Sequence, residues 1–307
     1  MYATAGIIAP VFAVIVLGAA ARGWRMLDAG GLRGINDVVF YLGIPALLFR
    51  SVIEAAELRL VGPATLYFGA CMVVFGAGVV LARFLLGAGL AQAGMAGLNA
   101  CYGNTVMVGV PIVSAAFGAE GVAIMLPIIA LHSALLLPLA TMLIEAEGTR
   151  ARNPLRMMAA TVPSLLRNPV IVSILLAFAW RLLGIPMPGP LHRLLDMLGA
   201  GAPALALFGL GATLPEFAAR GNVRETGAVA VLKLVVQPAL VWALAAAAGL
   251  GPVATAVTVI TAGQPTGANA FFLARRTGVS TAASAGTVVV STILSVFTLS
   301  ALLAWLR

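Results

Sequence analysis

The sequence predicts an all-α membrane protein, in which ten transmembrane helices form two inverted repeats of five and two of the helices are interrupted. Of the 307 residues, 62% are hydrophobic and 9% are charged, and the mean hydropathy is +1.08. No soluble domain buries that much apolar surface. Apolar segments of about 20 residues, or fewer inside a bundle, are long enough to span a bilayer. The predicted spans are 4–21, 35–53, 61–86, 95–117, 121–144, 169–184, 196–214, 226–249, 253–274 and 282–306.

Two of these spans are interrupted in the same way. The first interruption runs from Gly103 to Pro111 and the second from Gly263 to Phe271, and both contain glycine, proline and amide side chains. Proline lacks a backbone donor and clashes with the preceding turn, so each helix is expected to open there. In hydrocarbon an open helix is tolerated only where it is buried in protein or lines a polar cavity. A matched pair of such breaks indicates the substrate site of a secondary transporter.

The two halves of the chain also match each other. The segments around Pro45 and Pro203 are similar, and these prolines are 158 positions apart. The same offset carries Pro111 onto Asn269, inside the second interruption. Because five spans is an odd number, the second half must enter the membrane in the opposite sense, which makes an inverted repeat.

The repeat divides the chain into residues 1–148, a cytoplasmic linker at 149–168, and residues 169–307. The apolar N-terminus lacks the basic region of a secretory signal and is interpreted as a retained first span. If the N-terminus lies outside, twelve arginines fall on one side of the membrane and five on the other. The arginine-rich side is cytoplasmic, which predicts an inner-membrane protein with both termini on the non-cytoplasmic side.

The interruptions supply the candidate substrate site. A half-helix that begins at a break points free N–H groups and the positive end of its dipole at the cavity, which favours a carboxylate. The alternative is that the polar groups only satisfy each other and the freed carbonyls. The predicted substrate-binding residues are Asn104, Thr105, Gly109, Pro111, Gln264, Pro265, Thr266 and Asn269.

Three ionisable residues are candidates for a charge or coupling role. Lys233 lies inside a span, where it either faces the cavity and attracts an anion or snorkels to the cytoplasmic surface. His132 is either a proton relay or a hydrogen-bonded helix contact. Asp37, beside Asn36, either couples an ion or caps the N-terminus of the second span.

Six glycines are predicted to let helices pack closely. These glycines are Gly18, Gly69, Gly76, Gly78, Gly209 and Gly211.

Other classes of function find no support in the residues. Neither a nucleophile–base pair, paired intramembrane carboxylates, a metal motif nor a phosphate loop is present, which argues against an enzyme. Cys71 and Cys101 are interpreted as small core residues, so no disulfide, metal or cofactor is expected. The net charge of +8 comes from scattered arginines without interleaved aromatics, which argues against nucleic acid.

The residues also carry a resemblance to a known family. The segment Gly103–Pro111, the span around Pro45 and the stretch Gln264–Ala274 together resemble the auxin efflux carrier family. Over nearly its whole length the chain is similar to the bacterial branch of PIN-like permeases.

This resemblance implies a fold similar to the bile acid:sodium symporters, with a scaffold domain of spans one, two, six and seven and a moving transport domain. It implies that the protein forms homodimers and is surrounded by membrane lipid. It also implies organic-anion substrates, such as auxin in plants and malonate or malate in bacteria. Asn104 and Pro111 would belong to the first crossover, and Gln264 and Asn269 to the second. Plant members place a proline where this chain has Asn269, whereas Pro265 occurs earlier here, which argues against auxin itself.

The sequence therefore predicts a permease for a small organic anion, a mono- or dicarboxylate or an auxin-like acid, that works by alternating access. Two alternatives stay open. One is a sodium-coupled symporter of the same anion, although intramembrane acids are scarce. The other is a membrane sensor that binds the anion without moving it.

Overall fold

The computed structural model describes residues 2–55, 62–147, 163, 166–217 and 223–306, and nearly all of these residues are helical. In this described part, six helices are long and apolar enough to cross a membrane: 29–54, 62–85, 105–147, 189–217, 223–247 and 281–306. Shorter apolar helices cover 9–23, 169–182 and 252–262. The prediction of an all-α protein with membrane-spanning helices is confirmed, whereas the number of spans and their inverted repeat stay predictions.

The helices lie on the predicted segments, although α2 and α9 begin earlier than predicted, at Ala29 and Gly189. Most of the proposed linker at 149–168 lies outside the described residues. The first half contains α1 (Tyr2–Gly23), α2 (Ala29–Val38), α3 (Ile44–Glu54), α4 (Gly62–Val80), α5 (Leu90–Cys101) and α6 (Val110–Glu147). The second half contains α8 (Pro169–Leu182), α9 (Gly189–Thr213), α10 (Val223–Val231), α11 (Gln237–Ala247), α12 (Pro252–Ala262), α13 (Ala268–Thr277) and α14 (Thr281–Leu306).

Several helices contain a wide π-helical turn. These turns are η1 (Val39–Gly43), η2 (Leu81–Leu85), η3 (Thr105–Gly109) and η5 (Leu232–Val236).

Three of these π turns have the same cause. Each of η1, η3 and η5 ends two residues before a proline, namely Pro45, Pro111 and Pro238. A proline ring clashes with the carbonyl four residues earlier, and the turn widens to relieve that clash. Proline therefore loosens these helices without ending them.

Gly118 marks a break within α6. Its backbone angles are φ 62° and ψ −153°, outside the helical region. Glycine adopts a positive φ without a steric penalty. The break falls in the gap between the predicted spans 95–117 and 121–144, as expected from the sequence.

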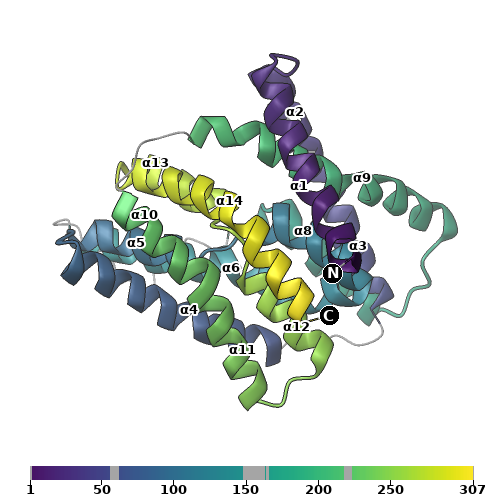
Figure 1. Ribbon diagram of the computed structural model, residues 1–307. Coiled ribbons are helices and arrows are strands. Elements are labelled where there is room, and N and C mark those ends of the chain that lie inside the picture. Colours follow the sequence, from purple (N-terminus) through teal and green to yellow (C-terminus); the bar gives the residue numbers. More distant parts are fainter. Residues whose placement is uncertain (1, 56–61, 148–162, 164–165, 218–222, 307) are drawn as a thin grey trace.

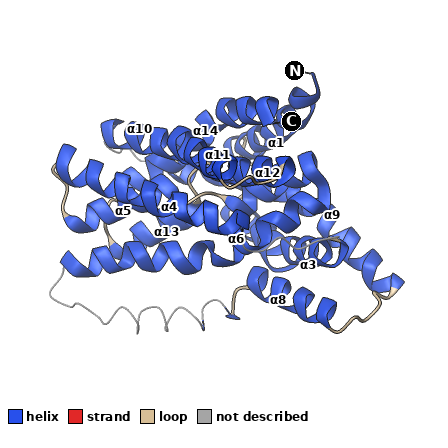
Figure 2. Ribbon diagram, turned by 90° about the horizontal axis from the view of Figure 1, so that it is seen from below, coloured by secondary structure: helices blue, strands red, loops and turns tan. Residues whose placement is uncertain are grey.

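The helices pack in two groups (Figures 1 and 2). On one side, α1 and α3 lie against α9, and α3 also lies against α8. On the other side, α4 packs on α5 and α11, and the middle of the molecule contains α6, α12 and α14. Each side forms a large hydrophobic cluster with the middle helices, one containing Ile15, Leu48 and Leu210 and the other containing Tyr67 and Leu98.

Close packing through glycine is confirmed at the contact between α1 and α9. A side chain on Gly18 would overlap the carbonyl of Phe208, and one on Gly211 would overlap the carbonyl of Ile15. Gly78 likewise lies against Gly97, whose Cα is 2.8 Å from the position that a Cβ on Gly78 would take. Gly209 lies against Asn36 in the same way.

The same prediction is wrong for Gly69 and Gly76. Nothing lies within 4 Å of the position that a Cβ would take on either residue. Both glycines lie on a face of α4 that no neighbouring helix approaches closely.

The capping interpretation of Asp37 is also wrong. The second span begins earlier than predicted, at Ala29, and its N-cap is Asp28, whose carboxylate accepts a 2.7 Å hydrogen bond from the Gly31 amide. Asp37 lies near the end of α2, exposed. Its coupling role stays a prediction.

Candidate functional site

The two interrupted helices meet where they break. The first break lies between the end of α5 at Cys101 and the start of η3 at Thr105, and the second lies between the ends of α12 and α13 that face each other. The Asn104 amide donates to the Pro265 carbonyl at 2.7 Å, and the Gly267 amide donates to the Tyr102 carbonyl at 2.9 Å. These bonds form an antiparallel bridge between Gly103 and Thr266. The breaks predicted from sequence therefore lie together and satisfy part of each other's open backbone.

Side chains from neighbouring helices satisfy further backbone groups at the bridge. The Gly103 amide donates to Nε2 of His132 at 3.0 Å. The Thr266 amide donates to the Ser291 hydroxyl, and the Thr266 hydroxyl donates to the Asn99 carbonyl, both at 2.9 Å. Buried backbone groups need such partners, so the bridge is a fixed part of the core.

The buried amides of Asn104 and Gln264 each have one polar atom without a partner. Oδ1 of Asn104 accepts from the Met107 amide at 3.3 Å, which leaves its Nδ2 unpartnered. Nε2 of Gln264 donates to the Ile260 carbonyl at 3.0 Å, which leaves its Oε1 unpartnered. Asn104 is 7% exposed and Gln264 is 0% exposed. Buried polar atoms normally have partners, so these two atoms are candidates for contact with a ligand.

Two helix N-termini begin at the breaks. The turn η3 starts at Thr105, which is buried, and leads through Gly109 and the buried Pro111 into α6. The helix α13 starts at Ala268 after Gly267, which has no side chain to cap it. The first amides of a helix have no partner within it and carry a partial positive charge. Both starts therefore favour an anion.

Asn269 lies in the first turn of α13 and is exposed. Its Nδ2 donates to the Tyr102 hydroxyl at 2.9 Å, and that hydroxyl lies 2.6 Å from the hydroxyl of Ser133. This chain of contacts connects the second break to α6. Asn269 therefore lies at the edge of the paired breaks, whereas Pro265 and Thr266 lie within them.

Lys233 and Gln237 contact the opposite ends of the broken helices. Nζ of Lys233 donates to the carbonyl of Ala262, the last residue of α12, and to Oε1 of Gln237 at 2.7 Å. Nε2 of Gln237 donates to the carbonyl of Cys101, the last residue of α5, at 3.3 Å. Lys233 is 0% exposed, so it does not snorkel to a surface.

His132 is built into the same region. It is 2% exposed, and its ring lies against Tyr102 with centroids 4.3 Å apart. Because Nε2 accepts the Gly103 amide, this nitrogen carries no proton in this arrangement. The geometry fits a helix contact, and the relay role stays a prediction.

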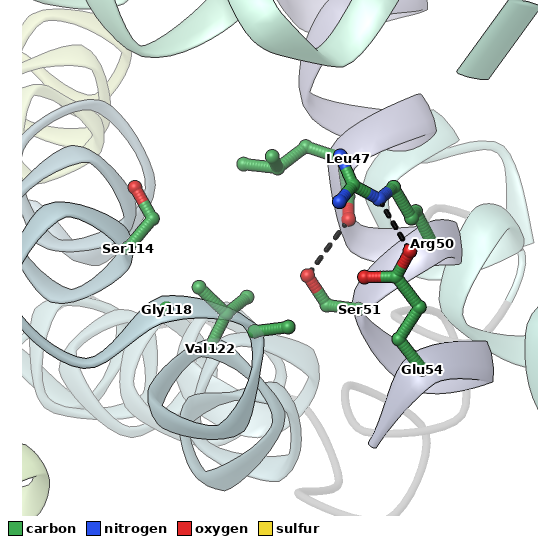
Figure 3. Close-up of a pocket in the computed structure, with 8 residues that line it drawn as sticks. Leu47, Arg50, Ser51, Glu54, Ser114, Gly118 and Val122 are labelled. Atoms are coloured by element: carbon green, nitrogen blue, oxygen red, sulfur yellow. Dashed lines mark hydrogen bonds and ion pairs between the residues drawn. The ribbon is translucent and has the colours of Figure 1, made fainter. Parts of the chain in front are cut away.

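A cavity of about 200 Å³ lies between α3 and α6, close to the break at Gly118 (Figure 3). None of the predicted site residues lines this cavity. The lining residues are Leu47, Arg50, Ser51, Glu54, Ser114, Gly118, Ala119 and Val122.

Arg50 anchors a cluster of ion pairs at the edge of this cavity. Its guanidinium binds Glu54 at 2.7 Å and Asp196 at 2.9 Å. His192 lies between the same two carboxylates, 3.1 Å from Glu54 and 3.0 Å from Asp196. The ligand atoms of Glu54, His192 and Asp196 lie within 4.8 Å of one another. Because the guanidinium already supplies positive charge there, we interpret the group as an ion-pair network that joins α3 to α9.

Sequence reasoning missed several residues of this region. Gln237 could have been found, since it lies one helical turn after Lys233 and directly before a proline. Arg50 lies within a predicted span, which is itself a functional signal. Asn99 and Ser291 carried no signal, because small polar residues are common in packed membrane helices.

Comparison with known proteins gives a consistent result. The family model described as "Membrane transport protein" matches residues 5–303. A protein of Rhizobium meliloti (strain 1021) named "Putative malonate transporter" is 28% identical over 312 residues, which cover 98% of this chain and 95% of that protein. Two proteins of Oryza sativa subsp. japonica, named "Probable auxin efflux carrier component 1b" and "1d", are 34% identical over 118 residues, 36% of this chain and 21% of theirs. The chain therefore belongs to the membrane transport protein family, the family of the auxin efflux carriers, and is a multi-pass membrane protein of a transporter family, not of an enzyme family.

Proposed function

We propose that this protein is a secondary transporter that moves a small organic anion by alternating access. The observation that carries the proposal is the pairing of two broken helices around the unpartnered Nδ2 of Asn104. Two helix N-termini begin beside this donor. Helix N-termini and amide donors are the groups that proteins use to bind a carboxylate without a full positive charge.

The arrangement of the helices supports a division into a scaffold and a moving part. In this proposal α1, α2, α3, α8 and α9 form the scaffold, and the other helices form the transport domain. One hydrophobic cluster lies within the proposed transport domain, and the other packs α1, α3, α8 and α9 against α6, α12 and α14. The cavity between α3 and α6 lies where the two parts meet. The same proposal includes the inverted repeat of residues 1–148 and 169–307 and an elevator-like motion.

We propose a small carboxylate, with malonate as the first candidate. The printed name of the full-length bacterial relative refers to malonate, and the plant relatives match only about a third of this chain. The paired breaks suit a small acid, because Thr105, Gln264 and Thr266 are buried and little space remains. Malate or an auxin-like acid is the second choice.

The named residues would share the binding work. Nδ2 of Asn104 donates to a carboxylate oxygen, and the first amides of η3 and α13 hold the same group. Oε1 of Gln264 accepts a hydrogen bond from a hydroxyl or protonated carboxyl group of the ligand, or from a bridging water. Gly109 and Pro111 shape the first break, and Pro265, Thr266 and Asn269 shape the second. Arg50, at the edge of the cavity, would offset part of the negative charge of Glu54 and Asp196, which would otherwise repel the anion.

The proposal extends to the location, topology and oligomeric state of the protein. We propose an inner-membrane protein surrounded by lipid, with both termini on the non-cytoplasmic side, that works as a homodimer without a cofactor or nucleic acid. A sodium-coupled symporter and a sensor of the same anion are the competing functions.

Uptake into proteoliposomes tests the proposal. Purified protein is reconstituted and offered labelled malonate, malate, oxalate or indole acetate, with imposed Na⁺, proton or voltage gradients. Saturable uptake of one acid identifies the substrate, and its response to each gradient identifies the coupling. Absence of uptake of all four acids by folded, inserted protein would contradict an organic-anion transporter of this class.

A further inference from the structure

The single lysine among the 307 residues is Lys233, whereas the other seventeen Lys and Arg residues are arginine. An ammonium differs from a guanidinium in being a compact charge with three donors. Lys233 is 0% exposed, and among the residues that the structure describes no arginine is buried. The surroundings of Lys233 explain this difference.

Lys233 lies where the C-termini of both broken helices meet. Its Nζ contacts the last carbonyl of α12 at Ala262 directly. It contacts Gln237, which donates in turn to the last carbonyl of α5 at Cys101. A Cβ on Gly103, inside the bridge, would lie 3.5 Å from the same Nζ. The ammonium therefore lies next to the paired breaks, on the side of the two helix C-termini.

The charge of this lysine is balanced by helix ends. No ion pair joins Lys233 to a carboxylate in the described part of the chain. A helix C-terminus carries about half a negative charge, so two of them together offset about one positive charge. A buried ammonium is tolerated when it is compensated and hydrogen-bonded in this way.

We propose that Lys233 is a cation built into the chain, which holds the two helix C-termini together in the position that a bound monovalent cation would otherwise take. It is a positioning residue: it keeps the breaks paired, and the two N-termini on the other side thereby stay aimed at the anion. This inference rests on the proposed function. It deepens that function by predicting that transport needs no added metal cation.

The turn η5 explains how Lys233 reaches this place. Pro238 causes the preceding helical turn, η5, to widen, and Lys233 lies within that turn. Lys233 and Gln237 are four residues apart and lie on one face. Removal of the lysine side chain would leave the Ala262 carbonyl and Oε1 of Gln237 around an empty space. Oxygen ligands of this kind suit a small cation.

Chemical rescue tests the proposal. Lys233→Ala is compared with Lys233→Met, which fills the space with an apolar chain, and with Arg33→Ala, a surface cation of α2, as control. Counterflow of labelled malonate is measured in choline, ammonium and sodium buffers at equal ionic strength, and folding is checked by size-exclusion chromatography. Loss of two charge-assisted contacts is expected to slow Lys233→Ala about tenfold or more in choline. Ammonium should restore part of that rate in Lys233→Ala and none in Lys233→Met.

Three results would overturn the inference. One is an unchanged rate for Lys233→Ala in choline, and another is a folded Lys233→Ala protein that ammonium does not rescue. The third needs no variant and therefore applies even if Lys233→Ala fails to fold: wild-type counterflow that stops when choline replaces sodium. Wild-type protein that shows no counterflow in any buffer would instead contradict the proposed function, so the two failures are distinguishable.

Discussion

Gly103 and Thr266, from opposite halves of the chain, face each other in an antiparallel backbone bridge. The bridge connects the two places where helices α5 and α12 open. An open helix in a membrane protein needs partners for its freed backbone groups, and here each break supplies part of what the other needs. The substrate site that we propose is built on this mutual support.

The bridge predicts a strong effect of Gly267→Ala. A Cβ there would lie 2.9 Å from the Tyr102 ring and 3.0 Å from the Gly103 carbonyl oxygen. Such overpacking costs about 1–3 kcal/mol, so we expect a lower melting temperature in detergent and slower uptake. Gly76→Ala is the control, since nothing lies within 4 Å of its Cβ position. Equal melting temperatures for the two variants would show that the bridge does not constrain the site.

The two buried amides predict weaker binding in Asn104→Ala and Gln264→Leu. Each variant removes an unpartnered polar atom that we assign to the ligand. A hydrogen bond to a charged group contributes about 1.5–3 kcal/mol, which corresponds to about a 10- to 100-fold loss of affinity for Asn104→Ala. Isothermal titration with malonate measures this loss. Gln92→Leu, an exposed amide at the start of α5, is the control. Wild-type affinity in both site variants would remove Asn104 and Gln264 from the site.

Substitutions of His132 can distinguish a structural role from a role as a proton relay. Its Nε2 accepts the Gly103 amide, and glutamine can supply an acceptor in its place. We expect His132→Gln to retain transport and His132→Leu to lose about 1–3 kcal/mol of stability, because the buried amide is left unpaired. Uptake driven by a proton gradient is the measurement. A His132→Gln protein that is stable but no longer responds to the proton gradient would support the relay instead.

Arg50 predicts a change in apparent affinity that depends on salt. Its guanidinium lies at the cavity between α3 and α6 (Figure 3). Arg50→Gln is expected to raise KM for malonate about three- to tenfold at low salt, with a smaller difference at high salt. Arg33→Gln, an exposed cation of α2, serves as control. A KM that changes equally in both variants would indicate a general surface effect rather than a role for the cavity.

The sequence alone was sufficient to predict the positions of most helices and the location of both breaks. Proline and glycine act locally: Gly103 lies in the first break and Pro265 in the second, whereas Pro111 only follows the widened turn η3. Gly118 likewise falls between two predicted spans. Asp37 was misassigned as a cap because Gly30 and Gly31 hid the early start of α2 at Ala29.

The contacts between distant segments could not be predicted in the same way. Hydropathy shows that Lys233 is in a span, but it does not show that Ala262 lies against it. The cavity beside Arg50 depends on how α3 and α6 pack, and neither segment carries that information alone. Gly69 and Gly76 show the same difficulty: small residues permit a close contact without requiring one.

Solute counterflow of labelled malonate tests the central claim most directly. Liposomes that contain the protein are loaded with unlabelled malonate, and labelled malonate is then added outside. We expect wild-type protein to produce a transient excess of labelled malonate inside the liposomes. The Gly267→Ala variant should produce a smaller excess. Malonate that binds the purified protein but produces no counterflow would contradict a transporter and favour a sensor.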